Sequence, residues 1–293
     1  MKIFFFFVIA VGLGSGSGLI YKTALQTKCR SLALFTVERG TVVFLFSFLS
    51  LKLSDFQPQI NAFWVGLAGG IAIMLARLSL LRAFTLGSTS LSWTIHNLSV
   101  AIPISASIFL FGEDPTRWQV AGLVTVPLSI MVIREKTKNL YTDKKNLTFK
   151  EAIRTSWLSL ILICFLFEGC LGICFKLIKE WGLQNSGNFF ILIYNLAAFL
   201  ICLIVILQSK QFPTKKDFFY GTASGICIGV SSYFWVRIIV SMPGIIFFPI
   251  ATIGGILVMT LCSYLIWNEK INRRQKWGLI LALISILLVS IPR

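Results

Sequence analysis

Apolar residues along the chain fall into ten runs that are separated by short polar segments. A helix needs about 20 mainly apolar residues to cross the hydrocarbon core of a membrane. The pattern therefore predicts an all-α integral membrane protein with ten transmembrane helices, of which the fifth and tenth are short. The runs cover residues 3–21, 33–51, 62–85, 89–111, 118–134, 156–178, 187–208, 217–240, 244–267 and 276–291.

The longest polar segment, residues 135–155, divides these runs into five and five. We interpret it as a basic linker loop between a first five-helix repeat, residues 1–134, and a second, residues 156–293. Because five is odd, the second repeat must begin on the opposite side of the membrane, which predicts inverted repeats. Positions that match at offsets of 154 to 156 residues are Glu113 and Glu269, Gly122 and Gly278, Gly66 and Gly221, Gly70 and Gly225, Arg82 and Arg237, and the segments "GLIYK" (18–22) and "GICFK" (172–176).

Two of the matched pairs lie in, or shortly after, the turns that precede the fifth and tenth runs. Glu113 and Glu269 lie in these turns, where a carboxylate complements the dipole of a helix N-terminus. Gly122 and Gly278 follow early in the next helix, where the lack of a side chain lets two helices approach closely. We interpret all four as elements of the fold and not as catalytic residues.

The hairpin segments "FGEDPTRWQVAG" and "WNEKINRRQKWG" resemble those of the drug/metabolite transporter superfamily, in its ten-helix EamA-like branch. Arg39 in the second run, Pro103 in the fourth and Pro249 in the ninth also fit that family's pattern. The resemblance extends over essentially the whole chain. It implies a carrier of small metabolites with a central cavity between the two halves, without indicating which metabolite. Pro249 is also expected to break its helix and free a carbonyl toward that cavity.

Composition agrees with a membrane protein, since 56% of residues are hydrophobic and only 13% are charged. The net charge of +16 comes from 27 Lys and Arg, most of which lie between apolar runs on the side opposite the termini. The positive-inside rule then places both termini outside the cytoplasm, whereas the similar family is usually drawn with cytoplasmic termini. We expect a multi-pass protein of the plasma (inner) membrane and no nucleic-acid partner, because no stacking platform accompanies the charge.

Glu168 is the strongest candidate for a functional residue. It lies near the centre of the sixth run, where an ionisable side chain is costly unless it is paired or faces a cavity. Such a carboxylate can hold a cationic substrate group or exchange a coupling proton. The alternative is a structural carboxylate that pairs with Arg39 or Arg77 of a neighbouring helix. Glu38 lies beside Arg39, and because adjacent helical residues do not face each other, each is expected to pair with another helix.

Further candidates for substrate binding come from the fourth and eighth runs. His96 is the only histidine of the chain, and Trp93 lies one helical turn before it, with Asn97 next to it. Histidine can titrate near neutral pH, although a lone helical histidine is also a common packing residue. Tyr233 and Trp235 can form an aromatic wall for a planar or cationic ligand, or they can anchor the helix at the membrane interface.

No nucleophile–base pair, metal-ligand cluster or nucleotide motif occurs in the sequence, so we expect neither an enzyme nor a bound metal or cofactor. The sequence predicts a secondary transporter (permease) that moves a small organic metabolite, an amino acid or a cationic compound, by alternating access. Its partners would be the substrate, the lipid bilayer and a coupling proton. Two alternatives stay open: a lipid-linked flippase or lipid-modifying membrane protein, and a non-transporting receptor or assembly subunit. The oligomeric state is not indicated.

Overall fold

The computed structural model describes residues 2–50, 57–133, 156–241, 244–269, 271–289 and 291, and all regular elements in these ranges are helices. The prediction of an all-α fold is confirmed for these residues. Side chains are described throughout these ranges except at 2–8, 49–50, 184, 233, 235–241 and 244–251. The predicted linker, residues 135–155, lies outside the described residues.

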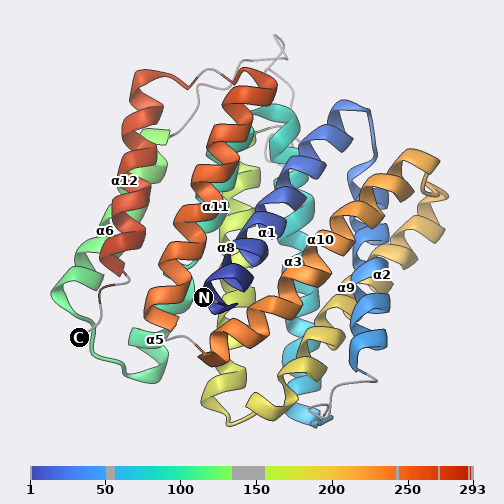
Figure 1. Cartoon of the computed structure of the whole chain (residues 1–293), viewed down its shortest axis with the longest axis horizontal. Helices are drawn as coiled ribbons and strands as arrows, with labels where there is room; N and C mark the ends of the chain where they lie inside the picture. The colour runs from blue at the N-terminus through green and yellow to red at the C-terminus, as the bar shows by residue number, and fades with distance from the viewer. Residues whose placement is uncertain are drawn as a thin grey trace, which may run out of the picture.

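A helix lies in each of the ten predicted runs, and the fourth run is divided between two helices (Figure 1). A short 3₁₀ helix, η2 (Gln184–Ser186), precedes the seventh run. The helices are α1 (Lys2–Gln26), α2 (Ser31–Ser50), α3 (Ile60–Leu86), α4 (Thr89–Leu98), α5 (Ala101–Phe111), α6 (Arg117–Ile133), α8 (Trp157–Glu180), α9 (Gly187–Ser209), α10 (Lys215–Ser241), α11 (Gly244–Trp267) and α12 (Arg273–Val289).

Several helices have the length and hydropathy of membrane spans. Five segments of the described residues qualify, namely Ser31–Phe48, Ile60–Leu86, Thr89–Phe111, Trp157–Glu180 and Gly187–Ser209. The helices α6 and α12 have 17 residues each, as the short fifth and tenth runs predict. Large apolar side chains such as Phe109, 83% exposed, face outward, as expected where lipid is the solvent. These features are compatible with a multi-pass membrane protein.

The fourth run is broken between α4 and α5 because of Pro103. Proline has no N–H to bond the carbonyl four residues earlier, and its ring clashes with that carbonyl. In this chain the carbonyl belongs to Ser99, and it accepts a hydrogen bond from the Ile102 N–H at 3.0 Å instead. The helix therefore ends at Leu98 and restarts at Ala101.

The predicted break at Pro249 is wrong, because α11 runs from Gly244 to Trp267 without interruption. Pro249 is only five residues into this helix. Its missing N–H deprives a single first-turn carbonyl, that of Ile245, of its helical partner. The loss of one bond so close to the helix start does not interrupt the turns that follow.

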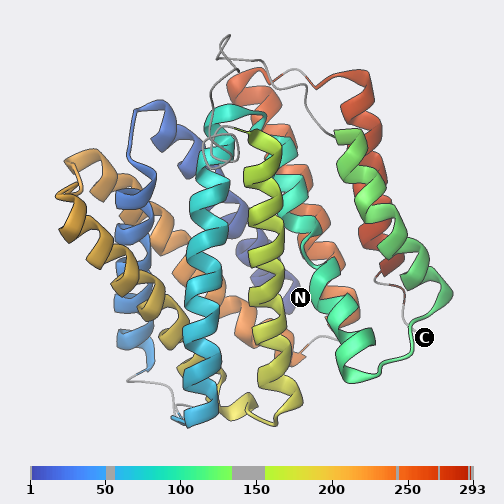
Figure 2. The same cartoon turned by 180° about the vertical axis from the view of Figure 1, so that it is seen from behind.

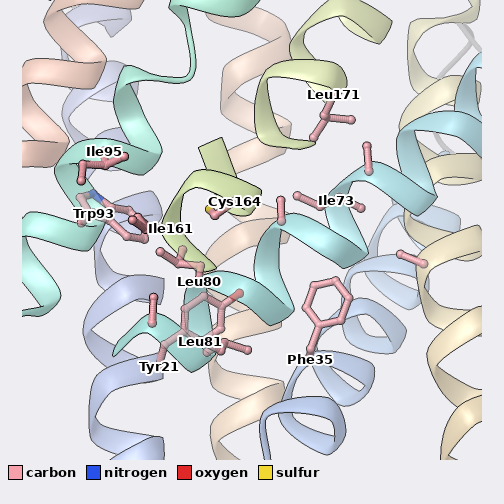
Figure 3. Close-up of a cluster of buried hydrophobic side chains, with 14 of the residues drawn as sticks. Tyr21, Phe35, Ile73, Leu80, Leu81, Trp93, Ile95, Ile161, Cys164 and Leu171 are labelled. Atoms are coloured by element: carbon pink, nitrogen blue, oxygen red, sulfur yellow. The ribbon is translucent and has the colours of Figure 1, made fainter. Parts of the chain in front are cut away.

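The core lies around α3, which packs against α8 on one side and α9 on another. Figure 3 shows side chains from several helices converging there, among them Tyr21 of α1, Leu80 of α3, Trp93 of α4 and Cys164 of α8. Tyr21 and Leu80 are fully buried. On the outside of this core, α6 and α12 form a pair that stands at one edge of the molecule (Figures 1 and 2).

Glycines make the closest helix contacts, and these contacts come in matching sets. A Cβ added to Gly70 of α3 would lie 2.5 Å from the Ala197 Cβ of α9, and one added to Gly225 of α10 would lie 2.6 Å from the Thr41 Cβ of α2. At the edge pair, a Cβ on Gly122 would lie 2.6 Å from Val289. The equivalent contact of α12 joins Gly278 to Ile133 of α6, also at 2.6 Å. The predicted packing role of Gly122 and Gly278 agrees with this geometry.

We expect Gly70→Ala to lower the free energy of unfolding by about 1–3 kcal/mol, the usual cost of overpacking a close contact. The new Cβ would also approach the Tyr194 carbonyl oxygen at 2.8 Å, so backbone must move. The matched control is Gly16→Ala in α1, where nothing lies within 4 Å of the added Cβ. Melting temperatures of the purified variants in detergent test this, and equal values for both would contradict it.

Candidate functional site

Three helices bring ionisable side chains together near the middle of the predicted membrane crossing. Glu168 of α8 lies 3.6 Å from Nη2 of Arg77, on α3, and 3.7 Å from Nδ1 of His96, on α4. By helical rise, Glu168 is within about 1 Å of the midpoint of its helix, and His96 is roughly 6 Å from the middle of the α4–α5 segment. The structure thus brings the two strongest predicted candidates, Glu168 and His96, into one cluster.

The His96 ring is enclosed by apolar and aromatic groups. It lies beside Trp93, with ring centroids 5.2 Å apart, and Cys164 Sγ is 3.7 Å from its Nδ1 atom. Trp93 itself fits between α1 and α11 because glycines make room for its indole. A Cβ on Gly18 would lie 2.9 Å from the ring, and one on Gly255 would lie 3.8 Å from Nε1. Both predicted aromatic and histidine positions of α4 therefore face the interior.

A second polar group lies on α2, α9 and α10. Arg39 donates to Glu38 at 2.6 Å and to Asn195 Oδ1 at 2.7 Å, and Ser224 Oγ donates to Glu38. The expectation that Glu38 and Arg39 pair only with other helices is therefore wrong in part, because they also pair with each other. The long arginine side chain can bend back to its neighbour, although the two Cβ atoms point in different directions.

Each polar group contains one ion pair, Arg77 with Glu168 in the first and Arg39 with Glu38 in the second. Together they hold two carboxylates and two guanidinium groups, so their charges balance. Of the two predicted partners of Glu168, Arg39 and Arg77, it is Arg77 that forms the direct ion pair.

Several buried polar atoms of this cluster have no hydrogen-bond partner among the described residues. They include Nε and Nη1 of Arg77, Oε2 of Glu168 and Nε1 of Trp93. A buried polar atom without a partner costs about 1–3 kcal/mol. Each of these atoms is enclosed and holds no hydrogen bond among the described residues, and Glu168 Oε2 faces His96 Nδ1 at 3.7 Å.

The other predicted site residues have different surroundings. The Asn97 amide donates to the Trp93 carbonyl at 2.7 Å, so it is used within its own helix. Tyr233 and Trp235 lie on α10, and their side chains are outside the described residues. Sequence reasoning did not identify Asn195 as part of the cluster. A signal for it existed, because Asn195 lies 156 residues after Arg39, the offset that relates the two hairpin glutamates.

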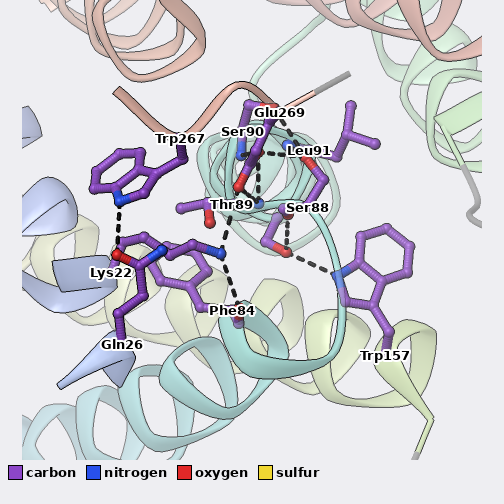
Figure 4. Close-up of polar contacts among 11 residues, drawn as sticks. Lys22, Gln26, Phe84, Ser88, Thr89, Ser90, Leu91, Trp157, Trp267 and Glu269 are labelled. Carbon is purple, nitrogen blue, oxygen red and sulfur yellow. Dashed lines mark hydrogen bonds and ion pairs between the residues drawn. The ribbon is translucent and has the colours of Figure 1, made fainter. Parts of the chain in front are cut away.

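The predicted fold element Glu269 holds the start of α4 (Figure 4). Its carboxylate accepts hydrogen bonds from Ser88 Oγ at 2.8 Å, from the Thr89 N–H at 3.1 Å and from the Ser90 N–H at 3.3 Å. Nζ of Lys22 lies 3.4 Å away. This carboxylate therefore complements the dipole of α4. Its position in the turn before α12 had suggested the helix that follows it.

Glu269 lies outside the membrane-spanning segments and its carboxyl is acidified by these contacts. Burial acts to raise its pKa, but the hydrogen bonds from Ser88 and Thr89 and the charge of Lys22 outweigh it and lower the pKa below the ordinary glutamate value. The side chain is only 14% exposed. Glu269 is therefore a charged, almost enclosed helix cap at neutral pH.

The matched glutamate, Glu113, also pairs with a lysine, but in the open. Its carboxylate accepts a hydrogen bond from Lys176, which also lies 3.2 Å from Glu180. The Glu113 side chain is 53% exposed, in contrast to the enclosed Glu269. Lys22 and Lys176 are themselves matched positions of the two halves, in the segments "GLIYK" and "GICFK". Two equivalent lysine–glutamate pairs thus differ in exposure, with the Glu269 carboxylate enclosed and the Glu113 carboxylate exposed.

Comparisons with known proteins find a similar fold and a distant relative, but they name no activity. No family model matches the chain. A protein of Haemophilus influenzae, described as uncharacterized, is 23% identical over 245 residues, which cover 82% of this chain and 79% of that protein. A solved crystal structure, described without a function, superposes with a TM-score of 0.60 at 13% identity and covers 96% of both chains. The chain therefore shares its overall fold with a solved protein.

Proposed function

We propose that this chain is a ten-span secondary transporter of the drug/metabolite transporter type, built from two inverted five-helix repeats, which moves a small polar metabolite by alternating access. The observation that carries the proposal is the cluster of paired charges around Glu168 near the middle of the predicted crossing. Charged groups at that depth are expensive and are typically kept for a transported ligand or ion.

The matching glycine contacts support the repeat. Gly66 of α3 meets Ile193 of α9, and Gly221 of α10 meets Val37 of α2. Gly221 lies 155 residues after Gly66, and Val37 lies 156 residues before Ile193. The two contacts therefore join equivalent positions of the matched segments, with the partners exchanged. The same exchange relates the two edge contacts between α6 and α12. Such an exchange is expected when the halves are related by a pseudo-two-fold axis in the membrane plane.

The break between α4 and α5 and the two lysine–glutamate pairs support alternating access. Discontinuous helices near the midplane are a recurring feature of transporter sites, and the break at Ser99 follows one turn after His96. The enclosed pair of Lys22 and Glu269 contrasts with the exposed pair at Glu113. In a transporter with inverted repeats, this difference corresponds to one closed and one more open end.

The charge balance of the cluster favours one of the two predicted substrate classes. A cation that approaches Glu168 would meet the charge of Arg77, 3.6 Å from the same carboxylate. A molecule with both charges offers an ammonium group to Glu168 and a carboxylate to Arg77, whose Nε and Nη1 hold no hydrogen bond among the described residues. An amino acid therefore fits better than a simple cation.

The lipid-flippase alternative predicts a polar groove open to the bilayer. The groove between α5, α6 and α8 is lined by apolar residues, with Ser105 as its single hydroxyl among the described residues. Such a lining does not favour the passage of a polar headgroup. No feature of the described residues favours a receptor or assembly subunit.

The test measures ligand binding and transport with the purified protein. The melting temperature is recorded against a library of metabolites at two pH values, for the wild type and for Glu168→Gln, and active compounds are then followed into proteoliposomes. We expect an amino acid to stabilise the wild type and to lose at least about tenfold in affinity with Glu168→Gln, as removal of a charged hydrogen-bond partner does.

The matched control is Glu180→Gln, at the end of the same helix, which should bind and transport as the wild type does. If Glu168→Gln and His96→Ala both transport normally, the cluster around Glu168 is not the binding site. A complete lack of metabolite binding and transport by the folded wild type would refute the transporter itself.

A further inference from the structure

An apolar groove runs along the side of the molecule, away from the charged cluster. Its volume is about 570 Å³, and none of its lining residues is charged. It is lined by residues of α5, α6 and α8, helices that lie toward the viewer in Figure 2. The lining residues are Ala101, Ile102, Ser105, Leu123, Val126, Pro127, Ile130, Met131, Leu158, Leu162 and Phe165.

The groove forms because α6 is packed loosely against α5 on this side of the molecule. This helix packs mainly against α12 and only lightly against α5. Pro127 lies inside α6 and cannot bond the Leu123 carbonyl, and both residues line the groove. Met131 and Leu162 remain 66% and 36% exposed, so the groove opens to the surroundings of the helices. In a membrane, these surroundings are lipid chains.

The length of the groove along α6 fits within one leaflet of a bilayer. Along α6 it extends from Leu123 to Met131, a rise of about 12 Å, which is less than half of a hydrocarbon core about 30 Å thick. Its Met131 end lies at the end of α6, next to the start of α12. There the exposed Arg274 donates from Nη2 to the Met131 carbonyl at 3.2 Å, and Arg273 is exposed beside it.

We infer that this groove binds an acyl chain of an anionic phospholipid, whose phosphate lies at Arg274. An apolar slot of leaflet depth suits a hydrocarbon chain, since Ser105 is its single polar side chain among the described residues and already donates to the Ala101 carbonyl. A guanidinium group at the membrane surface selects an anionic headgroup by charge and hydrogen bonding. This lipid site is independent of the proposed transport activity.

The experiment compares retained lipids by native mass spectrometry after purification in detergent and incubation with dioleoylphosphatidylglycerol or dioleoylphosphatidylcholine. We expect the wild type to prefer the phosphatidylglycerol by at least about tenfold, the effect of one charged hydrogen-bond partner. Arg274→Gln should abolish this preference, while the neighbouring Arg273→Gln keeps it. Ser105→Phe fills the groove and should abolish retention of both lipids.

A control for folding is Val120→Phe, which places the same phenylalanine side chain at an exposed position of α6. Both phenylalanine variants should keep a cooperative melting transition, and only Val120→Phe should be stabilised by phosphatidylglycerol. Equal lipid retention by the wild type and Ser105→Phe would overturn the inference, because the lipid would then be a general surface layer. A change from dimer to monomer on Ser105→Phe would overturn it as well, since the groove would then be an interface between two copies.

Discussion

Replacing Glu168 by glutamine should destabilise the protein by about 3–5 kcal/mol, because it leaves Arg77 as an unpaired charge in the interior. Replacing the whole pair, with Arg77→Met added to Glu168→Gln, should recover most of this loss, since a buried ion pair often contributes little more than apolar residues of similar size. Unfolding in mixed micelles, followed by circular dichroism for both single variants and the double variant, measures the coupling.

The same set of variants separates a structural role from a functional one. If Glu168 serves only to pair with Arg77, the double variant should be stable and should still bind and transport ligand. If the pair forms the binding site, the double variant should be stable and inactive. A loss of stability in the double variant equal to the sum of the two single losses would show that the 3.6 Å ion pair is not energetically coupled.

Replacing Glu269 by glutamine should lower the free energy of unfolding by about 1.5–3 kcal/mol, the range for hydrogen bonds to a charged group. The change removes the charge that faces Lys22 and weakens the cap of α4, where Glu269 accepts from Thr89 and Ser90 N–H groups. The mirror variant Glu113→Gln is the matched control. Its carboxylate is half exposed, and an exposed ion pair contributes only about 0–1 kcal/mol.

The contribution of Glu269 should depend on pH in a defined direction. Its pKa is lower in the folded protein than in the unfolded chain, so the folded state is stabilised where the carboxylate is charged in both. The contribution is complete above the ordinary glutamate pKa and is lost as the pH falls through the lower folded pKa. The melting temperatures of the wild type and Glu269→Gln should therefore converge in acid. A difference that stays constant down to the lowest usable pH would contradict this.

The sequence by itself determined the helices and several of their contact points. Apolar runs of sufficient length predict spans because a backbone in lipid must satisfy its own hydrogen bonds. Each run is helical in the described residues, the fourth as two helices. The close packing of Gly122 and Gly278 could also be predicted, because only a small residue allows such approach. Glu168 and His96 stood out as rare ionisable groups in apolar surroundings.

Only the tertiary structure decided which side chains meet. Hydropathy does not report how far each helix rotates or tilts, so the sequence left both Arg39 and Arg77 open as partners of Glu168. The same limit applies to Glu269, which caps α4 and not the helix that follows it in the sequence. The groove beside α6 depends on where that helix leaves its neighbours. Between helices in lipid, such contacts are set by the local fit of side chains, which a linear pattern of apolar residues does not encode.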